Sequence, residues 1–479
     1  MRRVDSLRRW LRPLLAALLA AGAVLPARAW NDHALLTWLA LQPMVAETAG
    51  QPAARAALRE RVRAESLEAF VAAEAPRLER LLAEHEAWAR ANLQAYDARP
   101  DDIAFRAGDA AVSGTDALAA SAALRQRFLM ALRVNPDVPM ALVLKLRPGA
   151  DAGARALLPW NAVSTLPAPE GGALTSPRFA ALAADEEVDA LEVLATASQE
   201  PDHGLDIGLY ADSGSAHGKR YGFGEQPFGN PALAYGSQAP VHMGFHHEAG
   251  LVFAAAGFLR RTQPEARIAL YLALSRHALA SGHRYWGWRF AGWALHYAQD
   301  LTVPYHASIL PGVSTLRMIA INTAALLGWP GPKAAATTLV SNRHAVIESY
   351  QQQHLAAAWQ QRPSDDALLA ALGDTAADTA RGAYTLADTR AQVSREAHDA
   401  AAALDAQIER SFPARYTADP QVELGTEPDR LDMVAIARAH SVAEQERLVQ
   451  QLATLMRRLA AHTRAFVRGV LVEPAAGLR

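Results

Sequence analysis

Histidine and carboxylate side chains occur together in the second half of this 479-residue sequence, at spacings that suit a metal ion. The densest segment is HYAQDLTVPYH, in which His296 is followed by Asp300 and His306. Residues four apart share one face of a helix, so His296 and Asp300 can contact the same ion. Pro304 ends that helix and allows His306 to turn back toward it.

A second pair with helical spacing, His344 and Glu348, lies in the segment RHAVIE. Either pair alone could be an ordinary ion pair on a protein surface. The chain has no cysteine, so any metal must bind nitrogen and oxygen ligands. Imidazole with carboxylate is the ligand set of hydrolytic zinc sites. The lack of cysteine also excludes disulfides, iron–sulfur clusters and a cysteine nucleophile.

The first 29 residues have the pattern of a secretory signal peptide. A segment rich in arginine precedes the apolar run Leu14–Leu25, and the Ala-Arg-Ala of residues 27–29 fits a cleavage site. The apolar run is too short to span a membrane, which needs about 20 residues. We therefore expect a secreted or periplasmic protein that begins at Trp30 after cleavage between Ala29 and Trp30.

Charge limits the class of partner. Cleavage would remove six arginines and one aspartate, which leaves 41 basic and 48 acidic residues and a formal charge of −7. An acidic protein is poorly suited to bind polyanions such as nucleic acid, because binding of that kind depends on clustered lysine and arginine. Composition therefore favours a substrate that is not a nucleic acid.

A new N-terminus at Trp30 would add ligands of its own. Its free α-amino group and its carbonyl oxygen can chelate one zinc ion, and His33 is close enough in sequence to complete the site. The order of N-terminal Trp, early His, Pro-Asp loop, His-x-x-x-Asp-x-x-x-Pro-x-His and His-x-x-x-Glu resembles the zinc-dependent phospholipase C family. The related fungal-type single-strand zinc nucleases share this order, usually with Asp in the last place. The match is a pattern of ligands spread over residues 30–348.

The resemblance implies three zinc ions, whose ligands can be carried over one position at a time. Trp30 and His33 would bind the first ion, and Asp300 would bridge it to the second. The second ion would also be bound by His296, by an aspartate from the loop and by a histidine that follows the loop. The third ion would be held by three side chains, namely His306, His344 and Glu348.

Two of these positions have more than one candidate. The loop aspartate is expected to be Asp202, which follows a proline, with Asp206 as the alternative. The histidine after the loop is expected to be His242, with His247 as the second choice and His246 as the third. Spacing along the chain does not separate these candidates further.

Such a cluster has a direct use in phosphodiester hydrolysis. Two bridged zinc ions about 3.5–4 Å apart lower the pKa of a shared water and neutralise the anionic oxygens of the phosphate. We expect in-line attack of zinc-bound hydroxide on phosphorus, with Asp202 as the candidate base. The predicted function is thus an exported, phospholipase C-like hydrolase. The alternatives are a single-strand nuclease or nucleotidase with the same ligands, and a non-catalytic protein stabilised by zinc.

A strongly apolar segment, residues 309–330, lies between two predicted ligands and is therefore expected near the mouth of the site. It predicts either a buried core helix or a helix that docks transiently on a membrane surface, with Trp329 at headgroup depth. Together with the acidic charge, the second interpretation favours a phospholipid or another phosphodiester over nucleic acid as the substrate.

Helices must position most of these ligands. Apolar residues recur at helical spacing in residues 65–96, 116–133, 247–258, 265–281, 285–299 and 441–470. One short strand is expected within residues 136–148. Residues 200–240 are dense in Gly, Pro, Asp and Asn, and they predict an ordered, irregular loop that carries function.

The pattern as a whole indicates an all-α protein with a multi-helix zinc hydrolase core over residues 30–360. The chain between His33 and the loop is far longer than in compact members of the family, so we expect a helical insertion at about residues 45–190. Residues 361–479 are expected to form a helical C-terminal extension, in place of the β-sandwich lipid-binding module of the family's toxin-like members.

Overall fold

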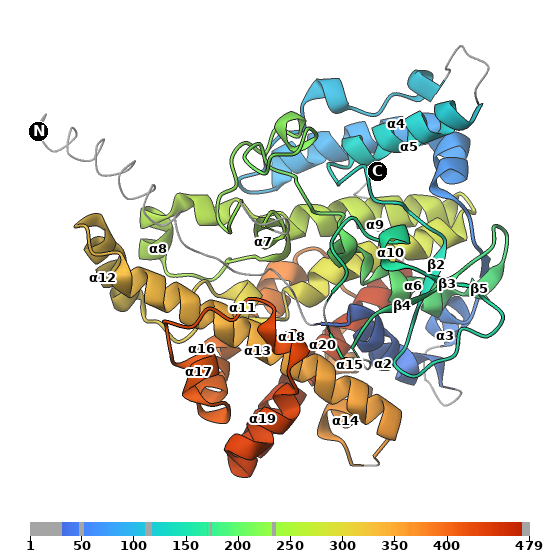
Figure 1. Cartoon of the computed structure of the whole chain (residues 1–479). Coiled ribbons are helices and arrows are strands. Elements are labelled where there is room, and N and C mark those ends of the chain that lie inside the picture. Colours follow the sequence, from blue (N-terminus) through green and yellow to red (C-terminus); the bar gives the residue numbers. More distant parts are fainter. Residues whose placement is uncertain are drawn as a thin grey trace, which may run out of the picture.

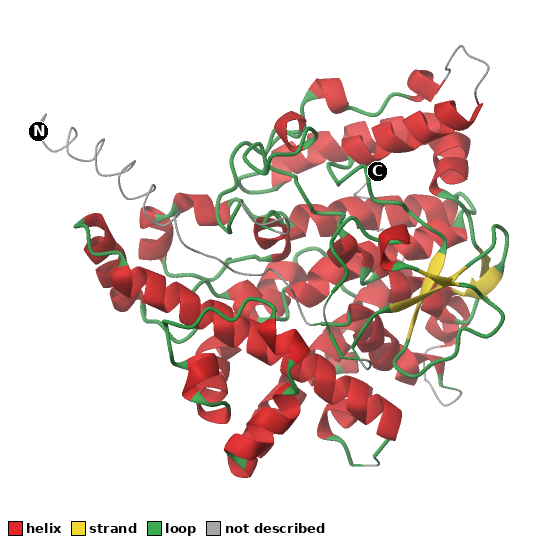
Figure 2. Cartoon of the chain, in the orientation of Figure 1, coloured by secondary structure: helices red, strands yellow, loops and turns green. Residues whose placement is uncertain are grey.

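The computed structural model describes residues 31–46, 52–110, 117–169, 171–172, 175–231, 236–363 and 365–471. Helices make up most of this part of the chain, as the sequence predicts, and the strands are few and short (Figures 1 and 2). The α-helices are α2 (His33–Val45), α3 (Pro52–Leu58), α4 (Leu67–Asn92), α5 (Ala117–Ala131), α6 (Ala190–Ala197), α7 (Gln238–His242), α8 (Gly250–Ala255), α9 (Pro264–Ala280), α10 (Arg284–Asp300), α11 (Pro304–Ala307), α12 (Thr315–Leu326), α13 (Gly331–Gln361), α14 (Ala367–Gly373), α15 (Asp378–Arg381), α16 (Ser394–Ser411), α17 (Ala414–Thr417), α18 (Glu427–Arg430), α19 (Met433–His440) and α20 (Val442–Leu471).

The strands of the described chain form two small antiparallel sheets, which Figure 2 shows in yellow. They are β1 (Arg61–Arg63), β2 (Val143–Leu146), β3 (Leu157–Leu158), β4 (Arg178–Ala181) and β5 (Glu187–Asp189). β1 pairs with β5, and β4 lies between β2 and β3, so that Lys145 is opposite Phe179. β2 lies where a strand was expected. The other strands, of two to four residues, are too short to show an alternating pattern in the sequence.

The long periodic segments fold as predicted. α4, α5, α9, α10 and α20 begin and end within four residues of the expected ranges. The Ser441 hydroxyl accepts the backbone N–H of Glu444 at 3.3 Å, which is half of the capping box expected there. The helix expected over residues 247–258 is shorter, because the chain leaves helical geometry at Ala256 (φ −132°, ψ 63°) after α8.

α10, which carries two predicted ligands, is buried along almost its whole length. All of its residues from Tyr285 to Asp300 are buried. A helix that is covered on all sides belongs in a protein core, so its aromatic run packs inside the fold and does not offer a surface for base stacking. Three indole side chains of this helix are fully buried, namely Trp286, Trp288 and Trp293.

A glycine lets α10 lie close to α6. A Cβ atom at Gly292 would be 2.5 Å from the Cβ of Ala197 and 2.7 Å from the carbonyl oxygen of Leu194, which no real side chain tolerates. Close packing of this kind fixes the last turns of α10 against the segment that follows α6. That segment contains Asp202, so two sets of predicted ligands are brought to the same place by helix packing.

Two large apolar clusters form the core. The first joins residues of α2, α4, α5, α6, α9, α10 and α20, and the second joins residues of α2, α13, α14, α16, α19 and α20. Helices from residues 45–190 and from residues 361–479 therefore share their cores with the helices that carry the predicted ligands. α2 and α20 contribute to both clusters, which ties the two ends of the described chain together.

The apolar segment 309–330 is not a buried core helix. It forms α12 and the turn to α13, and α12 buries only Met318, Ile321 and Asn322. Leu316, by contrast, is 78% exposed. Four large apolar side chains of this segment, Leu316, Ile319, Leu327 and Trp329, are exposed, because α12 packs on α13 and α8 and leaves its other side uncovered.

The position expected for this segment also needs correction. α13 begins at Gly331, 13 residues before the predicted ligand His344. At 1.5 Å per residue this corresponds to about 20 Å along the helix axis. The far end of the segment, around Trp329, is therefore well separated from the predicted ligands, although it lies between two of them in the sequence.

Candidate metal centre

Eight of the predicted ligands lie together in the described part of the chain, although they come from six different elements. They form three groups that could each hold a metal ion: His33, Asp202 and His296; His242, His296 and Asp300; and His306, His344 and Glu348. Within each group the candidate ligand atoms lie within 4.8 Å of one another. Trp30, the predicted N-terminal ligand, and the leader before it lie outside the described residues.

Helix ends provide most of these side chains. His33 begins α2, His242 ends α7, and Asp300 ends α10 one turn after His296. Asp202 lies in a 3₁₀ turn, Glu200–His203, that follows α6. Short, rigid elements around the centre of the fold thus bring together residues that are far apart in the sequence.

The first two groups share His296, and Asp300 of the second group also contacts His33 of the first. Its Oδ1 atom is 3.3 Å from His33 Nε2, whereas its Oδ2 atom is 2.9 Å from His242 Nδ1 and 3.3 Å from His296 Nε2. Asp202 Oδ1 lies 3.6 Å from His296 Nε2 and 3.8 Å from His242 Nδ1. Since the two oxygens of Asp300 face different histidines, this carboxylate has the position that a bridging ligand needs.

The third group adjoins the first two. His344 Nε2 is 2.7 Å from Glu348 Oε1, one turn further along α13, and the ring centroids of His344 and His306 are 5.2 Å apart. His306 Nδ1 donates to the carbonyl oxygen of His242 at 3.1 Å. The backbone at the end of α7 therefore links the third group to the others, and all three of its side chains are buried.

Four of these histidines are held in place by the ring nitrogen that points away from the ligand groups. The pairs are His33 Nδ1 with Gln299 Oε1 (2.8 Å), His296 Nδ1 with Ser198 O (2.8 Å), His306 Nδ1 with His242 O (3.1 Å) and His242 Nε2 with Asp206 Oδ2 (3.1 Å). Each partner is an oxygen acceptor, so the remote nitrogen carries the N–H and the inner nitrogen of a neutral ring carries a lone pair. Metal-binding histidines are oriented in this way.

The arrangement needs positive charge between its members. His296 Nε2 and His242 Nδ1 are 3.0 Å apart, and two lone pairs at this distance repel unless a cation or a proton lies between them. Both carboxylate oxygens of Asp300 are buried and have no well-formed hydrogen bond to a described residue. A buried carboxylate of this kind requires a charged partner or a metal. The donor set, imidazole and carboxylate without thiolate, fits zinc.

The pKa values follow from the same electrostatics. Burial alone would raise the pKa of Asp300, but the neighbouring imidazoles of His296 and His242 hold that pKa well below its usual range. Burial would lower the pKa of His242, yet the carboxylates of Asp300 and Asp206 outweigh it and raise the pKa to about 10. A metal ion must displace the proton of His242 to bind this ring, so metal affinity should weaken as the pH falls.

Asp206, the alternative loop ligand, supports the site from behind. Its Oδ2 atom accepts hydrogen bonds from His242 Nε2 at 3.1 Å and from the Tyr297 hydroxyl at 2.6 Å, and its Oδ1 atom accepts one from Arg267 at 2.9 Å. Burial raises its pKa, but Arg267 and His242 outweigh that effect and lower it. The structure thus separates the two candidates: Asp202 faces the ligand groups, and Asp206 orients His242.

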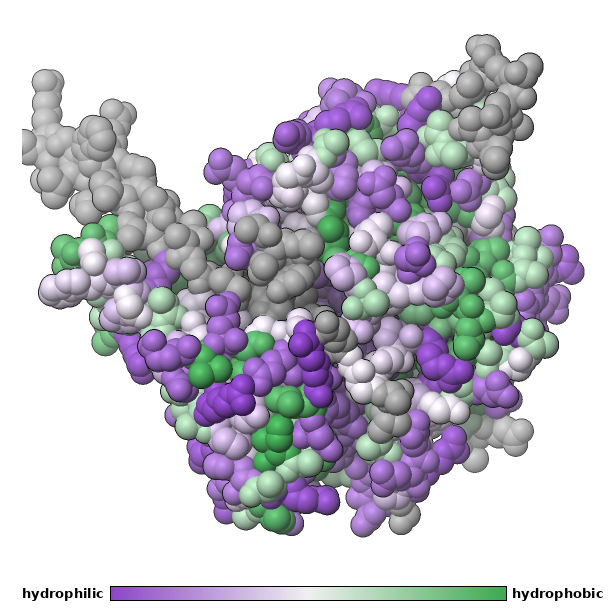
Figure 3. Space-filling model, in the orientation of Figure 1, coloured by the Kyte–Doolittle hydropathy of each residue, from purple (hydrophilic) through white to green (hydrophobic). Residues whose placement is uncertain are grey.

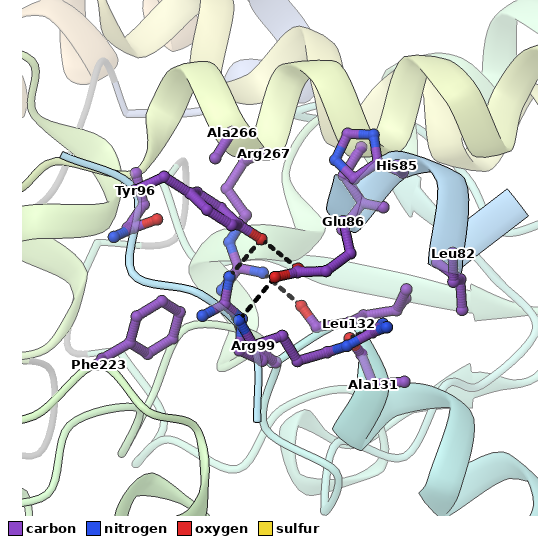
Figure 4. A pocket seen from close by; sticks show the side chains of 13 residues that line it. Leu82, His85, Glu86, Tyr96, Arg99, Ala131, Leu132, Phe223, Ala266 and Arg267 are labelled. Atoms are coloured by element: carbon purple, nitrogen blue, oxygen red, sulfur yellow. Dashed lines mark hydrogen bonds between the residues drawn. The ribbon is translucent and has the colours of Figure 1, made fainter. Parts of the chain in front are cut away.

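Arg267 connects Asp206 to residues 132 and 133, which lie in the helical insertion expected at about residues 45–190. Its guanidinium also donates to the carbonyl oxygens of Leu132 and Arg133, both at 2.8 Å. Figure 4 shows the cavity of about 30 Å³ beside it, where the Tyr96 hydroxyl donates to Glu86 and accepts from Arg133. That volume holds about one water molecule, so the cavity is too small for a substrate. The hydrogen bonds along its wall join two parts of the fold.

We expect Asp206→Asn to lower zinc affinity and activity by about 10- to 100-fold, because His242 loses the acceptor that fixes its tautomer. The measurements are zinc content at limiting metal and kcat. Tyr297→Phe, which removes one hydrogen bond to Asp206 but leaves the charge, should have a much smaller effect. If Asp206→Asn lowered only the melting temperature, with unchanged zinc affinity of the folded protein, Asp206 would serve merely to balance Arg267.

His247 and His246, the other candidates for the position of His242, are outside all three groups. His247 Nε2 lies 3.0 Å from both the carbonyl oxygen of Arg390 and the hydroxyl of Ser394, so its ring is turned toward the start of α16. Burial lowers the pKa of His246 to about 3. Of the three candidates for this position, the structure brings only His242 into the ligand groups. α7 ends at His242, and the turn that follows it directs His246 and His247 away from the three ligand groups.

A larger cavity, of about 340 Å³, opens beside Asp202. The Asp202 side chain is 18% exposed, whereas His242 and Asp300 are fully buried, so a bound molecule would reach the ligand groups at Asp202. Gln199 Nε2 donates to Asp202 Oδ2 at 2.8 Å, and this leaves Oδ1 facing the histidines. The volume is in the range of small-molecule sites.

The walls of this cavity come from many separate parts of the chain, between residues 31 and 430. The lining residues are Asn31, Asp32, Lys145, Trp160, 166–169, 171, 175–177, Gln199, Asp202, His203, Gln238, Gln352, Thr426, Asp429 and Arg430. Lys145, on β2, forms an ion pair with Asp32, and the Trp160 indole N–H donates to the carbonyl of Leu166 at 2.7 Å. Apart from Asp202, sequence reasoning missed the lining residues, because no local pattern marks them.

Comparisons with known proteins place the chain in no family: no family model, no curated protein and no solved structure matches it. The resemblance to phospholipase C therefore depends on the order of ligands alone. The fold and the site define a mostly helical protein with three adjoining His/Asp/Glu groups that could bind metal ions.

Proposed function

We propose that this protein is an exported, zinc-dependent phosphodiester hydrolase of the phospholipase C type. One observation carries the proposal: eight ligands chosen from the sequence, from His33 to Glu348, converge in three adjoining groups. An ordinary surface ion pair does not explain imidazoles that are buried and fixed by their remote nitrogens. Trp30, exposed by leader cleavage, would complete the site on the side of His33.

Bound zinc ions would supply a water of lowered pKa and would neutralise the phosphate oxygens. The chain itself would supply proton transfer and substrate binding. Asp202 Oδ1 faces His296 at the edge of the cavity, so it is placed to accept a proton from the attacking water and to orient it. Arg430 in the cavity wall, together with Lys145 on release from its ion pair with Asp32, would contact the negatively charged phosphate, and the apolar wall near Trp160 would contact the ester group.

A nucleotide is the second candidate substrate, and the cavity favours it in one respect. A volume of about 340 Å³ holds one compact group, such as a base with its sugar, and Trp160 adds an aromatic side chain to the wall. A non-catalytic zinc protein is the third alternative. The exposure of Asp202 argues against it, since structural zinc sites are closed to solvent.

The test uses the purified protein with its N-terminus determined by mass spectrometry. We expect three zinc ions per chain and hydrolysis of a chromogenic phosphorylcholine ester, with activity lost on chelation and restored by zinc. Hydrolysis of single-stranded DNA alone would assign the site to nucleic acid. Full zinc content with no turnover of either substrate would favour the structural alternative.

A further inference from the structure

The structure has a second unusual feature, which extends away from the metal groups. We call it the tip: α8 with the residues up to 264, and α12 with its flanking residues 309–333. It lies at the left of Figure 1. Seven large hydrophobic side chains are exposed in the described chain, and five belong to the tip, namely Leu251 (63%), Leu316 (78%), Ile319 (40%), Leu327 (71%) and Trp329 (70%).

The tip packs on the rest of the fold through one face of α12. α12 packs on α13 and α8 through a buried face that includes Met318 and Ile321, while Leu316 and Ile319 point away from that face. Ser314 caps the helix through its hydroxyl, which accepts the N–H of Arg317 at 3.3 Å. Figure 3 shows apolar side chains in green at this end of the molecule. An exposed apolar surface held in this way marks an interaction site.

The charge of the tip identifies the kind of partner. Residues 249–264 and 301–347 contain no aspartate or glutamate, although the chain has 49 acidic residues. They do contain cations, of which Arg260 and Arg317 are exposed. The segments of the tip are thus apolar and carry only positive charge, while the neighbouring carboxylate of Glu248 is engaged by the backbone N–H of Ile309 at 2.8 Å.

We propose that the tip docks the protein on the surface of an anionic lipid bilayer. Exposed leucines would enter the boundary of the acyl chains, Trp329 would lie at headgroup depth, and Arg260 and Arg317 would contact anionic headgroups. A second copy of the chain is a poorer partner, because two positive tips would repel each other. None of the helices in the described ranges is long and apolar enough to cross a membrane.

This docking goes beyond the proposed hydrolysis and does not depend on it. The start of α13 is about 20 Å from His344 along the helix axis, so a bilayer at the tip would not cover the metal groups. Binding can therefore be measured in protein that does not turn over lipid.

The experiment is co-sedimentation of the protein with vesicles of phosphatidylcholine, with and without phosphatidylglycerol. We expect binding to the anionic vesicles that weakens as salt is added. The variant Leu316→Ser/Trp329→Ser should bind at least about tenfold more weakly, since each side chain would no longer enter the apolar boundary. Leu157→Ser is the matched control, because Leu157 is 51% exposed on β3, outside the tip, and its loss should leave binding unchanged.

Two outcomes would overturn the docking proposal. One is equal vesicle binding by the tip variant and the wild-type protein. The other is a dimer in light scattering that the tip variant converts to monomers, which would make the tip a subunit interface. Repeating the measurement in Asp300→Asn protein separates the two proposals, since vesicle binding should persist there after hydrolysis is lost.

Discussion

Asp300→Asn should reduce hydrolysis of the phosphorylcholine ester by about 10³-fold or more and remove up to two zinc ions per chain. The two oxygens of Asp300 face His33 on one side and His242 and His296 on the other. An asparagine has one neutral oxygen and an amide nitrogen that does not bind zinc, so two metal positions lose a negative ligand at once. Loss of several kcal/mol of transition-state stabilisation corresponds to this factor. The measurements are kcat and zinc content of the folded protein.

A matched control is available for this variant. Asp378 is also a buried aspartate, but it pairs with Arg464 at 2.6 Å in another part of the fold. Asp378→Asn should lower the melting temperature and leave zinc content and activity near wild type. His33→Ala should cost less activity than Asp300→Asn, because it removes a ligand from one ion only. The opposite ranking would show that Asp300 does not bridge two ions.

The helices that could be predicted are those with long, regular apolar spacing. α10 is an example: its pattern extends over four turns, and its expected and observed ends differ by one residue. Short strands such as β3 could not be predicted in this way, and the helix expected over residues 247–258 is the shorter α8. Their geometry is imposed by neighbours in the fold, and two to six residues contain too little pattern to reveal it.

The ligands that the sequence identified best are those whose spacing is local. His296 with Asp300 and His344 with Glu348 follow from helical geometry, and both pairs are close in the structure. The choice between Asp202 and Asp206 was harder, because it depends on how the 3₁₀ turn after α6 rotates each side chain. Sequence order alone does not determine that rotation.

Residues outside the ligand set show the same limit. The support that Asp206 gives to His242, and the contact of Arg267 with the chain after α5, depend on the packing of three separate segments. The apolar character of residues 309–330 was evident, but the side on which α12 has a neighbour was not. Composition indicates how apolar a helix is, and only tertiary packing decides which of its faces is covered.

Substitution of Glu348, in the group formed with His306 and His344, should also have a large effect on activity. We expect Glu348→Gln to lose one zinc ion and about 10²-fold or more in kcat, with the other two ions retained. Glu348 Oε1 is 2.7 Å from His344 Nε2, and it is the one carboxylate among the three candidate ligands of this group. Its replacement by an amide removes the negative charge that would hold a divalent ion there. The expected decrease in kcat is of the size seen when one group that stabilises the transition state electrostatically is removed.

Glu396→Gln provides the control for this prediction, since Glu396 pairs with His462 at 3.1 Å without belonging to a metal-capable group. Its pKa is lowered to about 2, because His462 and Arg381 outweigh the effect of burial, so it is a charged partner of the same kind. The control variant should lose stability and keep three zinc ions. Equal zinc content in both variants would mean that His344 and Glu348 form a structural ion pair, and that the catalytic centre contains only the two groups around Asp300.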